Sequence, residues 1–452
     1  MNLNKLKKIY QFSPSFIKKA YSLIPWNLRM GKEYRETLAF LHNSLHWSEA
    51  KWKDYQTKEL RDLLKFCSEN IPYYQKQFQK YGIDIDAKDI WKEFYKIPFI
   101  DKETVTNNIN DFIPTTTAKL YSSTTGGTTG KPMQIFYDKQ SFAKEWAYKI
   151  FFWNEAIGYK PTDKKATFRG VASKDKLFIE NPIYNEIRFS PFSMEGDDMN
   201  VIVSKLLDYN PKYIHGYPSA IEQLANYFDE HNISFKDLKG VMLISENIYE
   251  HQRKKIEEIF GCKIYSFYGH SERLIFASML DDLDAYYAHP AYGIIELVDD
   301  QNIPITTCGK LGEIVGTGFI NRGMPLLRYK TGDFSSWSDK SSKVNMPKIG
   351  EIKGRWAQEY LIGKKGKKVS LTALNMHSEV YTKIKQMQYL QNEYGVVVLN
   401  IVKEDDFTKE DEKIILDEHM EKLGDEFELQ FRYVDSLKKT QAGKTKFLIQ
   451  NL

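Results

Sequence analysis

Two short apolar runs, each followed by a helix-like stretch, constrain the fold of this chain more than any other feature of its sequence. Tyr213–Tyr217 precedes the helical pattern of Ser219–His231, and Gly240–Ile244 precedes that of Tyr249–Phe260. A buried strand followed by a helix is the unit from which parallel sheets are built, because the helix carries the chain back to the start of the next strand. The region from about residue 90 to 350 therefore predicts an α/β fold with parallel-type sheets.

Other parts of the chain carry different patterns. Helix-like runs in the first 60 residues predict a helical N-terminal extension, and strand-like runs between about 285 and 340 predict a β-rich subdomain. Residues 395–433 combine strand-like and helix-like runs, which predict a compact α+β unit. Since the chain has 452 residues, more than one core is expected.

Composition excludes several classes of protein. No apolar run reaches the roughly 18 residues of a membrane span, and the net charge of +4 gives no reason to expect a nucleic-acid partner. Cys67, Cys262 and Cys308 are odd in number and far apart, so they predict neither a disulfide framework nor a metal site. Residues 1–30 lack the apolar core of a signal peptide. We expect a cytoplasmic location.

The N-terminal stretch Leu3–Tyr21 mixes lysines with apolar and aromatic residues, and Pro14 interrupts it. One interpretation is an extension that packs its aromatic side on the main domain and solvates its lysines. The other is a peripheral membrane contact through residues 1–30, in which the lysines meet anionic lipids. The sequence leaves both open.

A run of Gly, Ser and Thr at residues 121–132 predicts a phosphate-binding loop. Glycine lets the backbone turn its N–H groups toward an anion, and the hydroxyls and Lys131 add donors. The run does not match the P-loop of NTPases, because Thr125 takes the place of the first glycine and Pro132 that of the magnesium-binding hydroxyl. Taken alone, such a run is also typical of a flexible polar linker.

Three further motifs follow this loop in a fixed order, and together the four resemble the adenylate-forming ligases, the acyl-CoA synthetase and luciferase superfamily. The phenylacetate-CoA ligase and CapK-like branch is the most similar, because of Tyr-Gly-His-Ser-Glu-Arg and of the Arg before Tyr-Lys-Thr-Gly-Asp. The three motifs are Tyr265–Glu272, Leu327–Asp333 and Gly443-Lys444.

The resemblance implies the domain boundaries and the first part of the ATP site. It implies a large ATP- and acyl-binding domain, residues 1–355, of which 1–60 is the helical extension, joined by a hinge to a small mobile domain, residues 356–452. Thr128 is counted among the catalytic residues. The loop residues that would hold the ATP phosphates are Thr125, Gly126, Gly127, Thr128, Thr129, Gly130 and Lys131.

The same resemblance assigns roles to the second and third motifs. Glu272 is expected to be catalytic by binding Mg²⁺, a hard cation suited to a carboxylate and phosphate oxygens. Tyr268 corresponds to the ring that stacks on adenine, although a core tyrosine is the other interpretation. Asp333 would accept hydrogen bonds from the ribose hydroxyls.

Three weaker assignments complete the expected ATP site. Glu246 alone matches the turn that contacts adenine in the family. Arg328 and Arg355 would be cations near ribose and phosphate, or else members of surface ion pairs.

The acid and the catalytic lysine come last. Lys444 corresponds to the mobile catalytic lysine that bridges the attacking carboxylate and the α-phosphate. Histidines beside aromatic residues are more often structural than substrate-binding. The residues expected to line the acyl pocket are His215, Gly216, Tyr217, Pro218 and His270.

These observations favour an enzyme that uses ATP and Mg²⁺ to convert a carboxylic acid into an acyl-adenylate. The acyl group then passes to coenzyme A or to an amine or hydroxyl acceptor, and the likeness to CapK suggests capsule or polysaccharide biosynthesis. A non-catalytic nucleotide- or acyl-adenylate-binding component of a polysaccharide assembly system is the alternative. Intact Glu272, Asp333 and Lys444 favour the enzyme.

Overall fold

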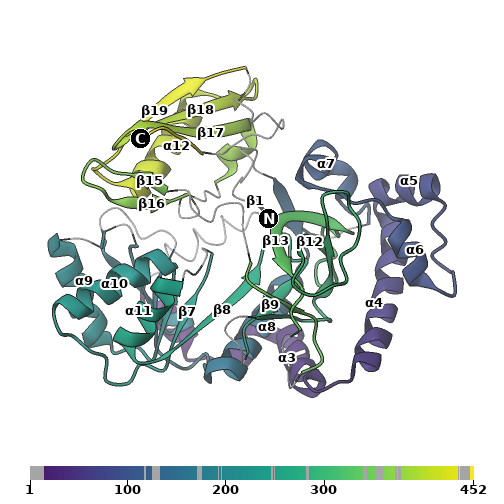
Figure 1. Ribbon diagram of the computed structural model, residues 1–452, viewed down its shortest axis with the longest axis horizontal. Coiled ribbons are helices and arrows are strands. Elements are labelled where there is room, and N and C mark those ends of the chain that lie inside the picture. The colour runs from purple at the N-terminus through teal and green to yellow at the C-terminus, as the bar shows by residue number, and fades with distance from the viewer. Residues whose placement is uncertain are drawn as a thin grey trace. The chain divides into compact units, whose positions relative to one another are not determined.

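The computed structural model (Figure 1) divides by its internal contacts into two compact units, each assembled from three stretches of chain. Unit 1 comprises residues 1–122, 135–162 and 265–354, and unit 2 comprises residues 123–134, 163–264 and 355–452. The structure describes residues 15–116, 119–124, 133–169, 176–191, 193–194, 196–245, 248, 250–280, 285–339, 344–352, 360–371, 374, 378–435, 437 and 448–452.

Helices dominate the N-terminal part of unit 1. They are α2 (Ser15–Ser22), α3 (Trp26–Ser44), α4 (Glu49–Asn70), α5 (Pro72–Tyr81), α6 (Ile90–Lys96), α7 (Lys102–Asn107) and η1 (Ile109–Phe112), followed later by α8 (Ser141–Ile157). Several begin at side-chain caps: the oxygens of Ser48, Asp89 and Asp101 accept from backbone N–H groups of the first turn. The helical extension expected in the first 60 residues contains α2, α3 and the first half of α4.

The strands of unit 1 form an antiparallel arrangement. The order β14-β10-β9-β8 joins β14 (Lys348–Ile349), β10 (Tyr286–Ala288), β9 (Phe276–Ser278) and β8 (Lys263–Gly269). A separate three-stranded antiparallel sheet joins β11 (Gly293–Val298), β12 (Leu311–Gly318) and β13 (Tyr329–Ser336). This sheet is the predicted β-rich subdomain.

Unit 2 contains the predicted parallel sheet. Strands β7 (Gly240–Leu243), β6 (Tyr213–Gly216), β3 (Lys165–Phe168) and β5 (Glu186–Phe189) pair in that order, all parallel, and β4 (Phe178–Asn181) adds an antiparallel edge. Parallel neighbours need long crossovers. The elements that connect these strands are η2 (Pro182–Tyr184), α9 (Gly196–Tyr209), α10 (Pro218–Glu230) and α11 (Glu250–Phe260).

The C-terminal part of unit 2 is the predicted α+β region, built on the sheet β19-β18-β17-β20. Strands β17 and β18 form an antiparallel hairpin, whereas β19 runs parallel to β18 because α12 lies between them in the chain. The elements are β15 (Tyr360–Ile362), β16 (Lys368–Ser370), η3 (Glu379–Lys383), β17 (Ile384–Glu393), β18 (Val396–Lys403), α12 (Lys409–Leu423), β19 (Glu428–Tyr433) and β20 (Leu448–Gln450). The α/β fold class is confirmed.

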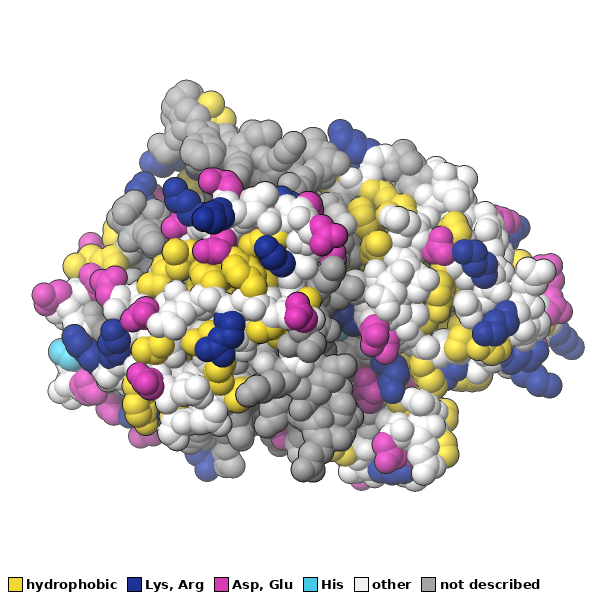
Figure 2. All heavy atoms as spheres, turned by 90° about the horizontal axis from the view of Figure 1, so that it is seen from above, with side chains coloured by type: hydrophobic (Ala, Val, Ile, Leu, Met, Phe, Trp, Pro, Cys, Tyr) yellow, Lys and Arg dark blue, Asp and Glu magenta, His cyan; other side chains and the backbone are white. Residues whose placement is uncertain are grey.

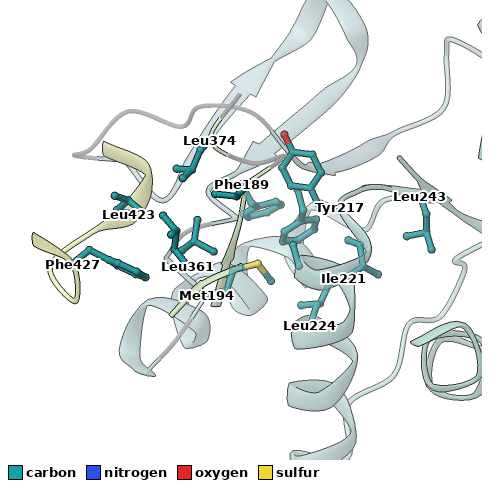
Figure 3. Close-up of a cluster of buried hydrophobic side chains, with 14 of the residues drawn as sticks. Phe189, Met194, Tyr217, Ile221, Leu224, Leu243, Leu361, Leu374, Leu423 and Phe427 are labelled. Atoms are coloured by element: carbon teal, nitrogen blue, oxygen red, sulfur yellow. The ribbon is translucent and has the colours of Figure 1, made fainter. Parts of the chain in front are cut away.

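One cluster of buried apolar side chains in unit 2 contains residues both of the 166–264 stretch and of the 361–448 stretch. Figure 3 shows part of it, with Phe189, Met194 and Leu361 among its members. A swing of residues 356–452 as a mobile domain stays a prediction, and it would have to open this cluster.

The surface carries both signs of charge. Figure 2 shows Lys and Arg side chains interspersed with Asp and Glu over one face. Among the residues that the structure describes, no helix is both long and apolar enough to cross a membrane. A separate two-stranded sheet joins β1 (Tyr121–Thr124) and β2 (Gln134–Tyr137), which precede and follow the Gly/Thr loop in the chain.

Candidate functional site

The predicted site residues fall into three groups. Tyr268, His270, Glu272, Arg328 and Asp333 lie in unit 1, and the segment 215–218 lies in unit 2. The remaining predictions fall outside the described residues: Thr125, Gly126, Gly127, Thr128, Thr129, Gly130, Lys131, Glu246, Arg355 and Lys444.

Two of the predicted motifs meet in unit 1. Tyr268 lies near the end of β8, with Glu272 in the turn that follows, and Asp333 lies on β13. The hydroxyl of Tyr268 donates to Oδ2 of Asp333 at 2.9 Å. In return, the hydroxyl of Tyr329 donates to Oε1 of Glu272 at 3.4 Å. Each motif thus supplies one tyrosine and one carboxylate, and the two tyrosines connect the motifs.

Burial and charge determine which of Tyr268 and Asp333 carries the proton of their hydrogen bond. Burial, followed by the charge of Asp333, raises the pKa of Tyr268 well above its ordinary value, so this hydroxyl stays a donor at neutral pH. A carboxylate offers several acceptor sites, and the Tyr268 hydroxyl occupies one of those of Asp333.

His270 lies beside Glu272, with its Nδ1 3.6 Å from Oε2. Burial lowers the pKa of His270, although Glu272 and Glu145 act in the opposite direction. Among the described residues, neither ring nitrogen has a hydrogen-bond partner within the chain. Buried polar atoms are normally satisfied, so these nitrogens are open to a bound molecule.

The turn that carries Glu272 is held by Arg273, which the sequence-based reasoning did not select. Arg273 has φ +56° and is 7% exposed. Its guanidinium pairs with Oε2 of Glu145 at 2.6 Å and donates to Oγ of Ser141 at 2.6 Å, both on α8. Burial opposes ionisation of Glu145, but Lys149 and Arg273 lower its pKa to about 2. The charge pair therefore fixes the turn against α8.

Tyr137, on β2, makes a second contact that fixes the turn carrying Glu272. The hydroxyl of Tyr137 donates to the carbonyl of Ser271 at 2.8 Å, and the Arg273 guanidinium lies 4.2 Å from the centre of the Tyr137 ring. Both contacts lie next to Glu272, so its backbone is positioned before any ligand arrives.

Arg328, expected to contact ATP, forms a buried ion pair. Its Nε and Nη2 pair with both oxygens of Glu296 at 3.1 and 2.8 Å. Its Nη1 donates to the carbonyls of Tyr95 and Ile97, each at 2.9 Å. The side chain is 5% exposed. Because these donors are used and buried, Arg328 forms a structural ion pair in this structure, and a contact with ribose or phosphate stays a prediction.

The local geometry of β13 explains its Thr-Gly-Asp sequence. Oγ1 of Thr331 donates to the carbonyl of Ile314 at 2.8 Å and accepts from the backbone N–H of Asp333 at 3.1 Å. Gly332 has φ +77°, a conformation that favours glycine, and its N–H donates to Glu313 at 3.1 Å. The pairing of β12 with β13 shifts register between Glu313 and Val315. The bulge and the threonine thus hold Asp333 in place.

In unit 2, the predicted acyl-pocket residues lie at the carboxyl ends of parallel strands. In the sheet, β5 lies on one side of β3. The next strand of the sheet in the chain, β6, lies on the other side of β3, so the direction of the strand order reverses there. Such a reversal creates a crevice beyond the carboxyl ends of the two central strands, where α/β proteins bind ligands. Arg169 directly follows β3, and Tyr217 directly follows β6.

His215, on β6, is buried and connects to this crevice through Arg169. Its Nδ1 donates to the carbonyl of Met242 at 2.9 Å, and its Nε2 accepts from Nη1 of Arg169 at 3.2 Å. Burial, followed by the charges of Arg169 and Lys165, lowers the pKa of His215 well below its ordinary value. The ring is therefore neutral and orients a cation that the sequence-based reasoning missed.

No acidic partner neutralises Arg169 within the described part of the chain, where no carboxylate lies within 4.0 Å of it. Gly216 permits the close approach of β6 to β3, because a Cβ there would lie 2.7 Å from the carbonyl of Phe168. A nearby carboxylate, Glu186, is buried and already binds Lys165 and Arg188. Arg169 thus remains a half-buried cation at the crevice.

A magnesium site is consistent with Glu272. Mg²⁺ takes oxygen ligands and is usually bound by one or two carboxylates together with substrate phosphates, so a single glutamate in this turn fits. Over the described ranges no group of three or more His, Cys, Asp or Glu could hold a metal ion by itself.

Comparison with known proteins identifies relatives of this chain. Residues 361–451 match the model of the CapK C-terminal domain. Protein CapK of Staphylococcus aureus is 24% identical over 412 residues, covering 88% of this chain and 89% of that protein. The phenylacetate-coenzyme A ligase of Pseudomonas putida is 25% identical, covering 67% and 70%. The predicted resemblance to the phenylacetate-CoA ligase and CapK-like branch is confirmed.

Solved structures share the fold. A 2-hydroxyisobutyryl-CoA ligase, crystallised with 2-HIB-AMP and CoA in the thioesterification state, superposes with a TM-score of 0.59 at 15% identity, covering 89% of this chain and 90% of that one. The same ligase in the postadenylation state with 2-HIB-AMP gives a TM-score of 0.58 at 14% identity, covering 90% of each chain. The phenylacetate-coenzyme A ligases among the relatives confirm the prediction of a ligase, and the solved structures show the shared fold.

Proposed function

We propose that this chain, a relative of CapK and of the phenylacetate-coenzyme A ligases, activates a carboxylic acid with ATP. In the first step, a carboxylate oxygen attacks the α-phosphorus, the bond from that phosphorus to the bridging oxygen breaks, and pyrophosphate leaves. In the second step, a nucleophile attacks the acyl carbon of the acyl-adenylate and AMP leaves. The observation that carries the proposal is the paired contact between two distant motifs, Tyr268 with Asp333 and Tyr329 with Glu272.

We assign the nucleoside to the Tyr268 and Asp333 pair. A carboxylate is a suitable acceptor for ribose hydroxyls, and the position of Asp333 is set by Tyr268 and Thr331. The aromatic ring of Tyr268 offers a face on which adenine can stack. The functional consequence is orientation, because a fixed nucleoside fixes the direction in which pyrophosphate leaves.

We assign Mg²⁺ to Glu272 when ATP is bound. The ion would neutralise phosphate charge, and Arg273 and Tyr329 position the carboxylate that holds it. The loop residues, with Thr128 among them, and Lys444 stay predicted partners of the phosphates and of the attacking carboxylate. Cations and N–H dipoles are what this chemistry requires, because two anions must approach each other.

We assign the acid to the crevice at the carboxyl ends of β3 and β6. Tyr217 provides an apolar wall, and Arg169 provides a cation without an acidic partner among the described residues. A purely hydrocarbon acid would leave this cation unpaired and partly desolvated, which is unfavourable. The substrate is therefore expected to carry a polar or anionic substituent besides the carboxylate that is activated.

The second acceptor is coenzyme A, or an amine or hydroxyl of an amino acid or sugar. The name of the CapK relative favours a role in capsule or polysaccharide biosynthesis, and the cytoplasm is the compartment that supplies ATP and coenzyme A. A non-catalytic, acyl-adenylate-binding component of a polysaccharide assembly system is the alternative, and it predicts nucleotide binding without pyrophosphate release.

The test is pyrophosphate release from ATP in the presence of a library of carboxylic acids, followed by mass spectrometry of products formed with coenzyme A or amino acceptors. Glu272→Gln should reduce release at least ~100-fold with the fold intact. Glu36→Gln, at an exposed glutamate of α3, is the matched control and should release pyrophosphate at the parental rate. ATP binding without release for every acid would favour the non-catalytic alternative.

A further inference from the structure

Large hydrophobic side chains are concentrated on the outside of the N-terminal helices. We define the N-terminal apolar patch as Ile17, Tyr21, Leu23, Ile24 and Leu28, all exposed. Leu23 and Leu28, at 83% and 62%, are the most exposed of the large hydrophobics in the described part of the chain. Single exposed apolar residues are ordinary, but five within twelve positions mark an interaction surface.

The patch is attached to a fixed part of unit 1. Trp26, at the start of α3, is buried with its ring edge-on to Tyr34 and Trp146 at 6.4 and 5.5 Å between ring centres. Two residues further on, about 200° around the helix, Leu28 points away from this contact. Arg29 lies over the rings of Tyr21 and Trp26 and so connects α2 to α3. The apolar side chains are therefore presented outward by an anchored element.

The sequence that carries the patch has charge of one sign up to residue 32. Residues 1–32 contain seven Lys and Arg and no Asp or Glu. Lys19, two positions after Ile17 in α2, is exposed. An apolar surface set among lysines matches the boundary of an anionic bilayer, where the side chains enter the acyl region and the cations remain among the headgroups. Cations near the surface of such a leaflet add electrostatic attraction, which salt weakens.

The same charge argues against the other occupants. A second copy of this chain would bring the same cationic segment to the interface, and like charges repel. A protein partner is less suited, because the buried centres of protein interfaces are depleted of lysine. The eight residues of α2 are also too short to cross a bilayer, so the contact would be with the membrane surface.

We infer that the N-terminal apolar patch docks this protein on the surface of an anionic lipid bilayer. Docking would present unit 1 at the membrane without a spanning segment. The inference does not depend on the proposed ligase activity.

The experiment is co-sedimentation of the full chain with vesicles of phosphatidylcholine alone and of phosphatidylcholine with phosphatidylglycerol. The parent should bind the anionic vesicles, and added salt should weaken this binding. The double variant Leu23→Ser/Leu28→Ser should bind at least ~10-fold more weakly, because two leucines no longer leave water. Ile303→Ser/Leu311→Ser, at exposed positions outside the patch, is the matched control and should bind like the parent.

Thermal unfolding of each variant checks that its fold is intact. Equal vesicle binding by the parent and the patch variant would overturn the inference. So would self-association of the parent, lost in the patch variant, without vesicle binding, since the patch would then belong to a second copy.

Discussion

Acidification should destabilise unit 1 through His289, a histidine buried at 2% exposure among aromatic rings. The rings of Trp52, Tyr148 and Phe152 lie edge-on to it, with ring centres 5.1 to 5.8 Å away. The backbone N–H of Ala291 donates to Nδ1 at 3.2 Å, so Nδ1 carries no proton. Burial lowers the pKa of His289 to about 3.

The magnitude follows from proton linkage. In the unfolded chain this histidine titrates near ~6.5, so the unfolded state binds more protons between about pH 6.5 and 3. Its contribution to stability is therefore complete above about pH 6.5 and is lost as the pH falls. At pH 5.0 the unfolded form is favoured by a factor of ~30 relative to pH 7.5, or about 2 kcal/mol.

The assay compares the parent with His289→Asn, whose side-chain oxygen can accept from Ala291 but cannot be protonated. Since the two units can unfold separately, hydrogen exchange of peptides around β10 and β11 should be measured together with urea unfolding at pH 7.5 and 5.0. The variant loses packing at both pH values, but its stability should change about 2 kcal/mol less between them. His231→Asn, at an exposed histidine, is the control. An unchanged pH difference in His289→Asn would refute the reasoning.

Three further outcomes are expected. Tyr268→Phe removes the hydrogen bond to Asp333 and should raise the KM for ATP ~10-fold, and 2′-deoxy-ATP should be discriminated against less than by the parent; equal discrimination would remove the pair from the ribose site. Arg273→Met removes one of the two cations paired with Glu145 and frees the Glu272 turn, so pyrophosphate release should fall and the apparent Mg²⁺ requirement should rise, whereas loss of stability alone would make Arg273 merely structural. Lys444→Ala should abolish acyl-adenylate formation yet still transfer the acyl group of a supplied acyl-adenylate, and equal loss of both steps would contradict the predicted role.

The sequence predicted those elements whose apolar pattern and whose boundary residues indicate the same helix or strand. Helix α12 lies within the α+β unit expected at 395–433, and its bounds are marked in the sequence, because Thr408 and Asp411 form a capping box and Gly424 follows its end. The strand and helix pairs β6–α10 and β7–α11 were also found within a few residues of their expected positions.

Strand β17 was not predicted, because polar residues interrupt its pattern. Gln388 and Gln391 are fully buried in it. The side chain of Gln391 accepts from the N–H of Ile362 at 3.0 Å and donates to its carbonyl at 2.7 Å, as a neighbouring strand would. Polar groups satisfied in this way by distant backbone leave no signal in the local sequence.

The candidate site shows the same limit. The motifs identified Tyr268, Glu272 and Asp333, but they did not reveal that Tyr329 connects them or that Arg169 lies beside His215. Arg328 was expected near ATP from the family resemblance. Its buried partner, Glu296, is 32 positions away in sequence, so no local pattern indicates the ion pair. Local sequence identifies the residue types that the chemistry needs, whereas pairing across the fold decides which of them remain available.

The apolar cluster shared by residues 166–264 and 361–448 has a consequence for synthesis of the chain. The cluster residues of the 166–264 stretch leave the ribosome about 100 residues before their packing partners in the 361–448 stretch. At ordinary rates of translation this is an interval of roughly 5–20 s. During that interval Phe189, Met194 and their neighbours lack part of their cover, and unit 1 can close first because its last stretch ends at residue 354. A nascent chain stalled or truncated before residue 361 would therefore expose this surface to chaperones and to aggregation, even with every residue of unit 1 in place.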